Sequence, residues 1–157
     1  MDINIVCCGR MKEKYLEEAV SEYIKMTGRF CRVRVTEVAD EPLANVKSAA
    51  DEAKVLKKEA ERISPHLKGY VIATDVDGKW MDSYEFSDCL KEAFEKHGSA
   101  VTFVVGSSLG LDGSIKDAAD IRISFSHMTM PHRLFRVVLA EQIFRAFKIM
   151  NGETYQK

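Results

Sequence analysis

The stretch AVTFVVG, residues 100–106, is an almost unbroken apolar run that ends at a glycine. A strand has such a continuous apolar run when both faces of its sheet are covered, whereas a half-exposed strand alternates apolar and polar residues. Two shorter runs, INIVCC (3–8) and the start of YVIATDVDG (70–78), have the same character, and the second is expected to turn after Thr74. RVRVTEV (32–38) alternates, and IRISFS (121–126) is a short fifth strand.

Segments of helical periodicity separate these strands, at residues 12–27, 44–63, 83–98, 114–119 and 131–150. Ser83 is the expected N-cap of the third of them. Strands that alternate with helices predict an α/β fold, with a mostly parallel sheet covered by helices on both faces. We find no linker or internal repeat, and we expect a single domain over residues 1–157. Ligands of such sheets bind at the carboxyl ends of the strands, which directs attention to segments 74–78, 106–108 and 125–130.

The composition is that of an ordinary globular protein, with 46% apolar and 30% charged residues and a net charge of -1. Nucleic-acid binding would therefore depend on a local basic cluster. The sequence has no 18-residue apolar run and no signal-peptide pattern at its start, so we expect a cytoplasmic protein without a membrane span. Cys7, Cys8, Cys31 and Cys89 form no C-x-x-C pair, and we expect reduced thiols and no metal site.

The loop VVGSSLGLDG (104–113) has the spacing G-x-x-x-G-x-x-G, which matches neither a P-loop nor a dinucleotide fingerprint. Its glycines either serve a tight turn or let the backbone approach a ligand, and both interpretations remain open. The loop SHMTMPH (126–132) likewise either binds a base through its main chain and methionines or simply joins the core. Pro131 suits the first turn of the last helix.

That last helix is apolar over most of its circumference, which favours a dimer interface, with a central core helix as the alternative. Between residues 132 and 157, five cations face two acids, a local excess that is consistent with a phosphate-binding surface, although ordinary solvated surface charge is the commoner explanation of such an excess. The cations are Arg133, Arg136, Arg145, Lys148 and Lys157, and the acids are Glu141 and Glu153.

Three segments, VCCGRMKEKYLEEAVSEYIKM (6–26), FVVGSSLGL (103–111) and SFSHMTMPHRLFRVVLAEQIFRAFKIMNGETYQK (124–157), resemble the RlmH family of the SPOUT superfamily. The resemblance implies an S-adenosylmethionine-dependent methyltransferase that methylates N3 of a pseudouridine in 23S ribosomal RNA of the assembled ribosome. It also implies a homodimer and a deep trefoil knot, with the knot and cofactor site in about residues 70–157. The implied cofactor-binding residues are Thr74, Gly106, Phe125, Ser126, His127, Met128, Thr129 and Met130.

The resemblance also suggests residues for catalysis and RNA binding. His132 is the candidate proton acceptor or base-positioning group, and Arg133 and Arg136 are candidates for RNA contacts. The tail residues Tyr155, Gln156 and Lys157 would complete the partner subunit's site.

Two positions depart from the family pattern: Gln156 stands where a histidine is common, and Ser107 where a second glycine is usual. A non-catalytic ribosome-binding factor is therefore the alternative function. A flavodoxin-like domain that binds another nucleotide is a weaker one.

Overall fold

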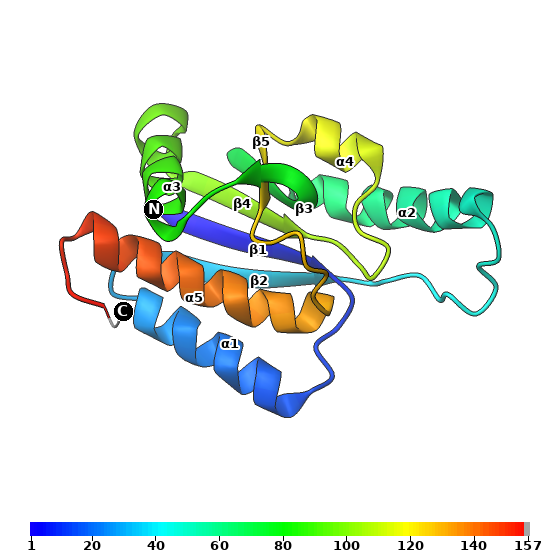
Figure 1. Cartoon of the computed structure of the whole chain (residues 1–157), viewed down its shortest axis with the longest axis horizontal. Helices are drawn as coiled ribbons and strands as arrows, with labels where there is room; N and C mark the ends of the chain where they lie inside the picture. The colour runs from blue at the N-terminus through cyan, green and yellow to red at the C-terminus, as the bar shows by residue number, and fades with distance from the viewer. Residues whose placement is uncertain (156–157) are drawn as a thin grey trace.

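The computed structural model, in which residues 1–155 are described, is built on one five-stranded sheet (Figure 1). The strand order is β2-β1-β4-β3-β5, and every pair of neighbouring strands is parallel. The α/β class and the parallel sheet predicted from the sequence are confirmed. The strands are β1 (Asp2–Cys8), β2 (Arg32–Val38), β3 (Tyr70–Trp80), β4 (Ala100–Val105) and β5 (Ile121–Ser124).

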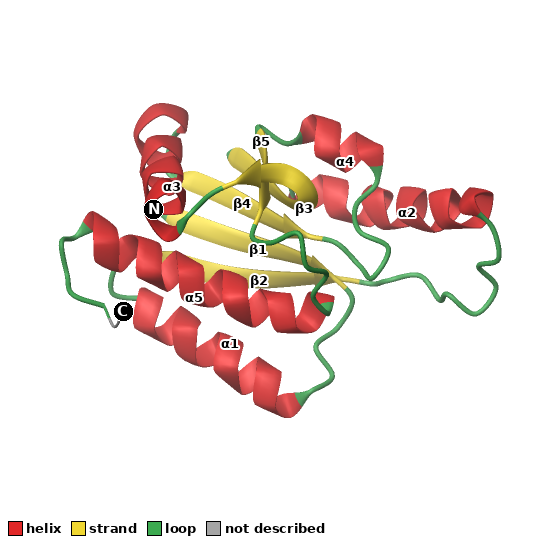
Figure 2. Cartoon of the chain, viewed as in Figure 1, coloured by secondary structure: helices red, strands yellow, loops and turns green. Residues whose placement is uncertain are grey.

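Helices cover both faces of this sheet, as predicted (Figure 2). Helices α1, α3 and α5 lie on one side, and α2 and α4 lie on the other (Figure 1). A short 3-10 turn, η1 (Ser64–His66), follows α2. The α-helices are α1 (Lys14–Thr27), α2 (Ala49–Ile63), α3 (Ser83–His97), α4 (Gly113–Ala118) and α5 (His132–Met150).

The pleat of β1 divides its side chains between two hydrophobic cores. Ile3, Ile5 and Cys7 pack into the core that α3 and α5 cover. Val6 and Cys8 point to the opposite face, into the core beneath α2 and α4. Strand β4 alternates in the same way, with side chains in both cores. Double coverage therefore explains the unbroken apolar run at 100–106, since neither face of the strand meets water.

The cysteines take part in this packing. All four are free, and Cys7, Cys8 and Cys31 are buried. Burial raises the pKa of each of these three thiols to about 12, so they stay protonated and unreactive at neutral pH. Within residues 1–155 no group of three His, Cys, Asp or Glu side chains is arranged to hold a metal ion. None of the helices described is long and apolar enough to cross a bilayer.

Helix α5 lies on the sheet beside α1, and it also contacts α3 (Figure 1). Leu139, Ile143 and Phe147 enter the core over the sheet. Phe144 points to the other side, toward the rings of Tyr23 and Phe30. Contacts within one chain thus cover much of the apolar surface of α5, which fits the core-helix alternative, while Leu134 stays 43% exposed. The homodimer stays a prediction without support from this feature.

Strand β3 does not turn at residues 75–78, so that prediction is wrong. The strand continues to Trp80, and both Thr74 and Lys79 pair with Ile123 of β5, which leaves the residues between them as a bulge. A Cβ at Gly78 would lie 2.7 Å from the backbone nitrogen of Ile123. Only glycine allows this close approach of two backbones, so the glycine here serves strand pairing.

One predicted helix start, one N-cap and one strand end also need correction. Helix α2 begins at Ala49, not residue 44, because Ser48 caps it by accepting a hydrogen bond from the Asp51 backbone N–H. Helix α3 is capped by Asp82, one residue before the predicted Ser83, in a reciprocal capping box with Glu85. Strand β5 ends two residues early, which leaves 125–126 in the loop that follows.

Candidate functional site

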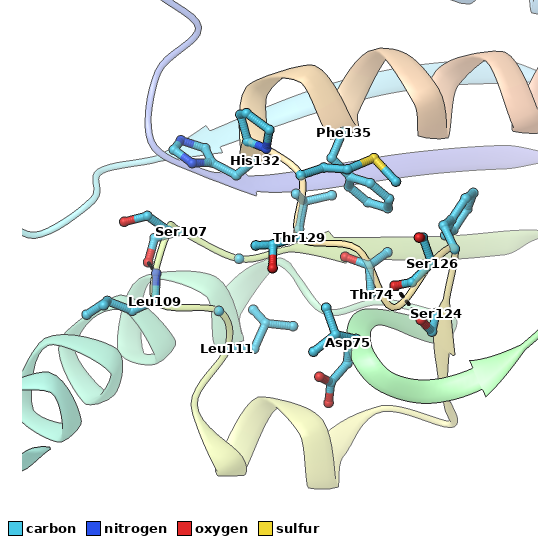
Figure 3. Close-up of a pocket in the computed structure, with 18 of the residues that line it drawn as sticks. Thr74, Asp75, Ser107, Leu109, Leu111, Ser124, Ser126, Thr129, His132 and Phe135 are labelled. Carbon is cyan, nitrogen blue, oxygen red and sulfur yellow. Dashed lines mark hydrogen bonds between the residues drawn. The ribbon is translucent and has the colours of Figure 1, made fainter.

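A cavity of about 580 Å³ lies at the carboxyl ends of β3, β4 and β5 (Figure 3). This volume is in the range of small-molecule sites. The three segments that form it are the ones that the sheet rule selected from the sequence. They are residues 74–76 after the paired part of β3, 105–111 after β4 and 123–132 after β5.

Seven of the eight predicted cofactor-binding residues line this cavity, and His127 does not. The His127 ring instead lies 3.9 Å from the ring of Trp80, centroid to centroid, beyond the bulge of β3. The seven are Thr74, Gly106, Phe125, Ser126, Met128, Thr129 and Met130. Sequence reasoning missed several other lining residues, among them Asp75, Leu109, Leu111 and Phe135. Their position directly after strands, or within the first turn of α5, was the only available signal.

The end of β3 places one hydroxyl and one carboxylate at the cavity. The Thr74 hydroxyl donates to the carbonyl oxygen of Val104, which ties β3 to β4 and leaves its oxygen free to accept. Asp75 has a side chain only 5% exposed, and it pairs with Lys116 at 3.0 Å and with Arg122 at 3.5 Å. These two cations neutralise a carboxylate that would otherwise be costly to bury.

The glycine loop after β4 is shaped by its own backbone. A Cβ at Gly106 would lie 2.3 Å from the carbonyl oxygen of Gly110, so a side chain there would collide with the loop. Gly110 itself has φ +87, a conformation that strongly favours glycine. The Gly110 N–H donates to the Ser107 carbonyl at 2.9 Å and closes the turn. The structure thus assigns both glycines to the turn, and the turn places its backbone against the cavity.

The buried carboxylate of Glu59, on α2, holds the glycine loop in place through a hydrogen bond. The Ser107 hydroxyl donates to Glu59 of α2 at 2.8 Å and accepts from the Leu109 N–H at 3.3 Å. Glu59 is 2% exposed, and its other oxygen accepts from the backbone N–H of Glu41 at 3.0 Å. The serine that departs from the family pattern therefore anchors its loop to α2.

The loop after β5 is bent by two serines. The Ser124 hydroxyl donates to the Ser126 carbonyl oxygen at 3.2 Å, and the Ser126 hydroxyl accepts from the Met128 N–H at 2.9 Å. These bonds direct the loop around the cavity wall (Figure 3). Met128 is 78% exposed although it lines the cavity, so one edge of the site is open to solvent. Pro131 is the N-cap of α5, one position before the predicted first turn.

His132, the first residue of α5, is half-buried in the cavity wall (Figure 3). Its Nε2 atom is buried and has no hydrogen-bond partner in the part of the chain that is described. Burial, then the charges of Arg136 and Arg133, lower the pKa of this imidazole below 6.5, against the opposing charges of Asp40 and Glu13. The ring is therefore neutral at pH 7, and a neutral ring can accept a proton.

The two predicted RNA-contacting arginines lie differently from what the sequence suggested. Arg136 is 2% exposed and donates to Glu37 at 2.9 Å and to the carbonyl oxygens of Cys8 and Gly9 at 3.0 and 2.7 Å. This burial leaves no surface for an RNA contact, so that expectation for Arg136 does not fit the structure. Arg133 is 21% exposed and pairs with Glu13 at 2.8 Å. Both side chains hold the segment between β1 and α1.

Tyr155, from the predicted catalytic tail, lies far from the cavity of its own chain. Its ring packs edge-on against Phe144 at 5.2 Å and beneath the guanidinium of Arg145 at 4.4 Å. Twelve residues of helix separate Phe144 from His132, which is about 18 Å along the axis of α5. Burial and the charge of Glu141 raise the pKa of Tyr155 to about 12, so the phenol keeps its proton. Gln156 and Lys157 lie outside the described residues.

A parallel sheet with helices on both faces and a cavity at its strand ends is the arrangement typical of α/β proteins that bind small molecules. The chain belongs to the SPOUT methyltransferase family and, within it, to the RlmH group. The model of the family described as "Predicted SPOUT methyltransferase" matches residues 1–156. A ribosomal RNA large subunit methyltransferase H from Ruminiclostridium cellulolyticum is 47% identical, and one from Streptococcus equi subsp. zooepidemicus is 43% identical, each over the whole of both chains.

Solved structures support the fold alone. A probable methylase family protein from Haemophilus influenzae superposes with a TM-score of 0.57 at 13% identity, covering 99% of this chain and 70% of that one. A probable methyltransferase from Bordetella pertussis superposes with a TM-score of 0.56 at 12% identity, covering 92% and 93%.

Proposed function

We propose that this protein is an S-adenosylmethionine-dependent methyltransferase that methylates N3 of a pseudouridine in 23S ribosomal RNA of the assembled ribosome. The observation that carries the proposal is the cavity at the strand ends, which gathers seven of the eight residues expected to bind the cofactor. Family membership and the names of the full-length relatives support an activity on large-subunit ribosomal RNA. A ribosomal substrate would also place the protein in the cytoplasm.

The residues of the cavity fit S-adenosylmethionine. Loop 106–111 and loop 125–130 offer backbone groups to an adenine edge, and Met130, Leu111 and Phe135 offer apolar surface to its faces. The volume of about 580 Å³ is sufficient for a ligand of this size. The cofactor supplies an activated methyl group, so the protein must provide chiefly proximity and alignment.

His132 is the residue of this chain best placed to handle the proton of the base. The N3–H must be lost or shared as the methyl group is transferred, and a neutral imidazole accepts it. The unpartnered Nε2 and the lowered pKa both suit this role. Tyr155, with a pKa of about 12, is suited to donating a hydrogen bond and not to accepting the proton.

A homodimer with composite sites is part of the proposal. Within one chain Tyr155 and the cavity lie at opposite ends of α5, so the proposal places the tail at the cavity of a second copy. We further propose that the family's deep trefoil knot is formed by the C-terminal part of the chain, within residues 70–157.

The test is transfer of labelled methyl groups from S-adenosylmethionine to ribosomes from cells that lack this enzyme, followed by mapping of the modified nucleotide. Label at a large-subunit pseudouridine is expected. Absence of label, with cofactor and ribosome binding both intact, would favour the non-catalytic ribosome-binding factor. A His132→Ala variant with an unchanged single-turnover rate would remove His132 from the mechanism.

A further inference from the structure

The segment from Gly9 to Lys14 comprises the connection between β1 and α1 together with the first residue of α1, and several hydrogen bonds hold it in place. Its start is fixed by the Gly9 N–H, which donates to Val38, and by Arg136, which donates to the Gly9 carbonyl. Its middle is fixed by the Met11 N–H, which donates to Glu37 at 2.8 Å. We call residues 9–14 the β1–α1 loop. An ordered loop loses little conformational entropy when it binds a partner.

Two acidic side chains near this loop, Glu37 and Glu13, accept hydrogen bonds from its anchors, and a third, Asp40, lies next to Gly9. Glu37 accepts from both Arg136 and the Met11 N–H, and Glu13 accepts from Arg133. These carboxylates therefore face inward, toward cations from α5. Glu13 and Glu37 are thus paired with arginines of α5, and no ion pair joins Arg10 or Lys12 of the loop to an acidic side chain among residues 1–155.

Arg10, Lys12 and Lys14 of the loop are exposed. Among residues 1–155, neither Arg10 nor Lys12 has an acidic side chain within ion-pair distance, and Lys14 makes only a solvent-exposed contact with Glu18 at 3.8 Å. Tyr15, the next residue, is 70% exposed. Free cations next to an exposed aromatic ring suit a nucleic acid, whose phosphates and bases they can contact together.

The loop also lies next to the candidate proton acceptor. Arg133 and Arg136, which hold it, follow His132 within one turn of α5, and the charge of Glu13 reaches the His132 imidazole. Figure 1 shows the β1–α1 connection passing beside the start of α5. A base that enters the cavity past His132 would bring its flanking phosphates over this loop.

We propose that the β1–α1 loop is an RNA-binding surface in which Arg10 and Lys12 contact phosphates next to the target nucleotide. Arg133 and Arg136 of α5 position this loop through their bonds to Glu13 and to the Gly9 carbonyl oxygen. This inference rests on the proposed function, because it takes ribosomal RNA as the partner. It also identifies the basic cluster that a chain of net charge -1 needs for such a partner.

The test compares two double variants that each remove two exposed cations. Arg10→Ala/Lys12→Ala alters the loop, and Lys54→Ala/Lys57→Ala alters α2 on the other side of the sheet. Ribosome binding is measured by co-sedimentation at several salt concentrations, and S-adenosylmethionine binding by calorimetry. We expect the loop variant to bind ribosomes at least tenfold more weakly, with a salt slope shallower by about 1 to 2. Its cofactor affinity should not change.

The α2 variant should bind ribosomes as the wild type does. Equal ribosome binding by the loop variant and the wild type would overturn the inference, as would an equal loss in the two variants. Failure of the proposed function has a different signature, since the wild-type protein would then bind ribosomes or cofactor without transferring a methyl group. A wild type that does not bind ribosomes would overturn both.

Discussion

The Ser107 hydroxyl donates a 2.8 Å hydrogen bond to Glu59, and this bond joins the cavity loop to a helix on the far side of the sheet. Glu59 is 2% exposed, so its carboxylate depends on the few donors that reach it. A glycine at position 107 would remove one of them. The serine that departs from the family pattern therefore stabilises its loop, which weakens the argument for a non-catalytic protein.

Ser107→Ala should lower the free energy of unfolding by about 1–3 kcal/mol, because it leaves the Glu59 carboxylate buried with one donor fewer. Glu59→Gln should cost less, since the amide keeps the shape and carries no charge. The two substitutions touch one interaction, so their effects should not add. Urea denaturation of the single and double variants measures this coupling, and strict additivity would contradict it.

Gly106→Ala should disrupt the cavity, because its methyl group would lie 2.3 Å from the Gly110 carbonyl oxygen. We expect a loss of about 1–3 kcal/mol in stability from the forced backbone shift, together with weaker cofactor binding. Gly113→Ala is the matched control, since a Cβ there meets nothing within 4 Å. Calorimetry with S-adenosylmethionine should separate the two variants, and equal affinities would refute the expectation.

Arg136→Ala should destabilise the protein by about 3 kcal/mol, because it removes a buried cation from Glu37 and from two carbonyl oxygens. Arg136→Lys should recover only part of this loss, since an ammonium group cannot form the same fork of bonds. Lys91→Ala, at an exposed ion pair on α3, should change stability by less than about 0.5 kcal/mol. If Arg136→Ala proves as stable as Lys91→Ala, the bonds from Arg136 to Glu37 and to the two carbonyl oxygens do not contribute to stability.

The sequence predicted the sheet well because burial on two faces leaves a direct trace in the residues. The apolar run 100–106 and the alternation of 32–38 both follow from how many faces of each strand are covered. The same reasoning located the site, since the rule of strand carboxyl ends depends only on topology. The start of α2 was less accurate, since the helix begins only after the Ser48 cap. Helix α3 begins at residue 83 as predicted, but its cap is Asp82, whose neighbour Ser83 is also a good capping residue.

Long-range contacts could not be predicted in this way. Nothing local in the sequence indicates that Arg136 meets the carbonyl oxygens at the end of β1, 127 and 128 residues away. A cluster of arginines looks the same whether its members are buried or exposed. The bulge of β3 was hidden for a similar reason, because Asp75 and Gly78 have the composition of a turn and nothing local indicates that Thr74 and Lys79 both pair with Ile123 of β5.

The lowered pKa of His132 predicts how stability depends on pH. The imidazole is harder to protonate in the folded state than in the unfolded chain, whose value is 6.5. Stability is therefore unaffected by this residue above about pH 6.5, and it falls as the pH drops from there through the lowered pKa. His132→Gln cannot be protonated, so it should lose less stability than the wild type between pH 7.5 and pH 5.

Urea denaturation of the two proteins at a series of pH values measures the difference. The two proteins are compared by the slope of the unfolding free energy against pH. A loss of stability that is the same at every pH therefore does not affect the comparison. Bound S-adenosylmethionine should stabilise both proteins, and a partner for the His132 Nε2 atom supplied by the ligand would alter the slope of the wild type alone. Parallel curves for wild type and variant without the ligand would mean that His132 is as easily protonated in the folded state as in the unfolded chain. The lowered pKa would then no longer be an argument for the neutral ring.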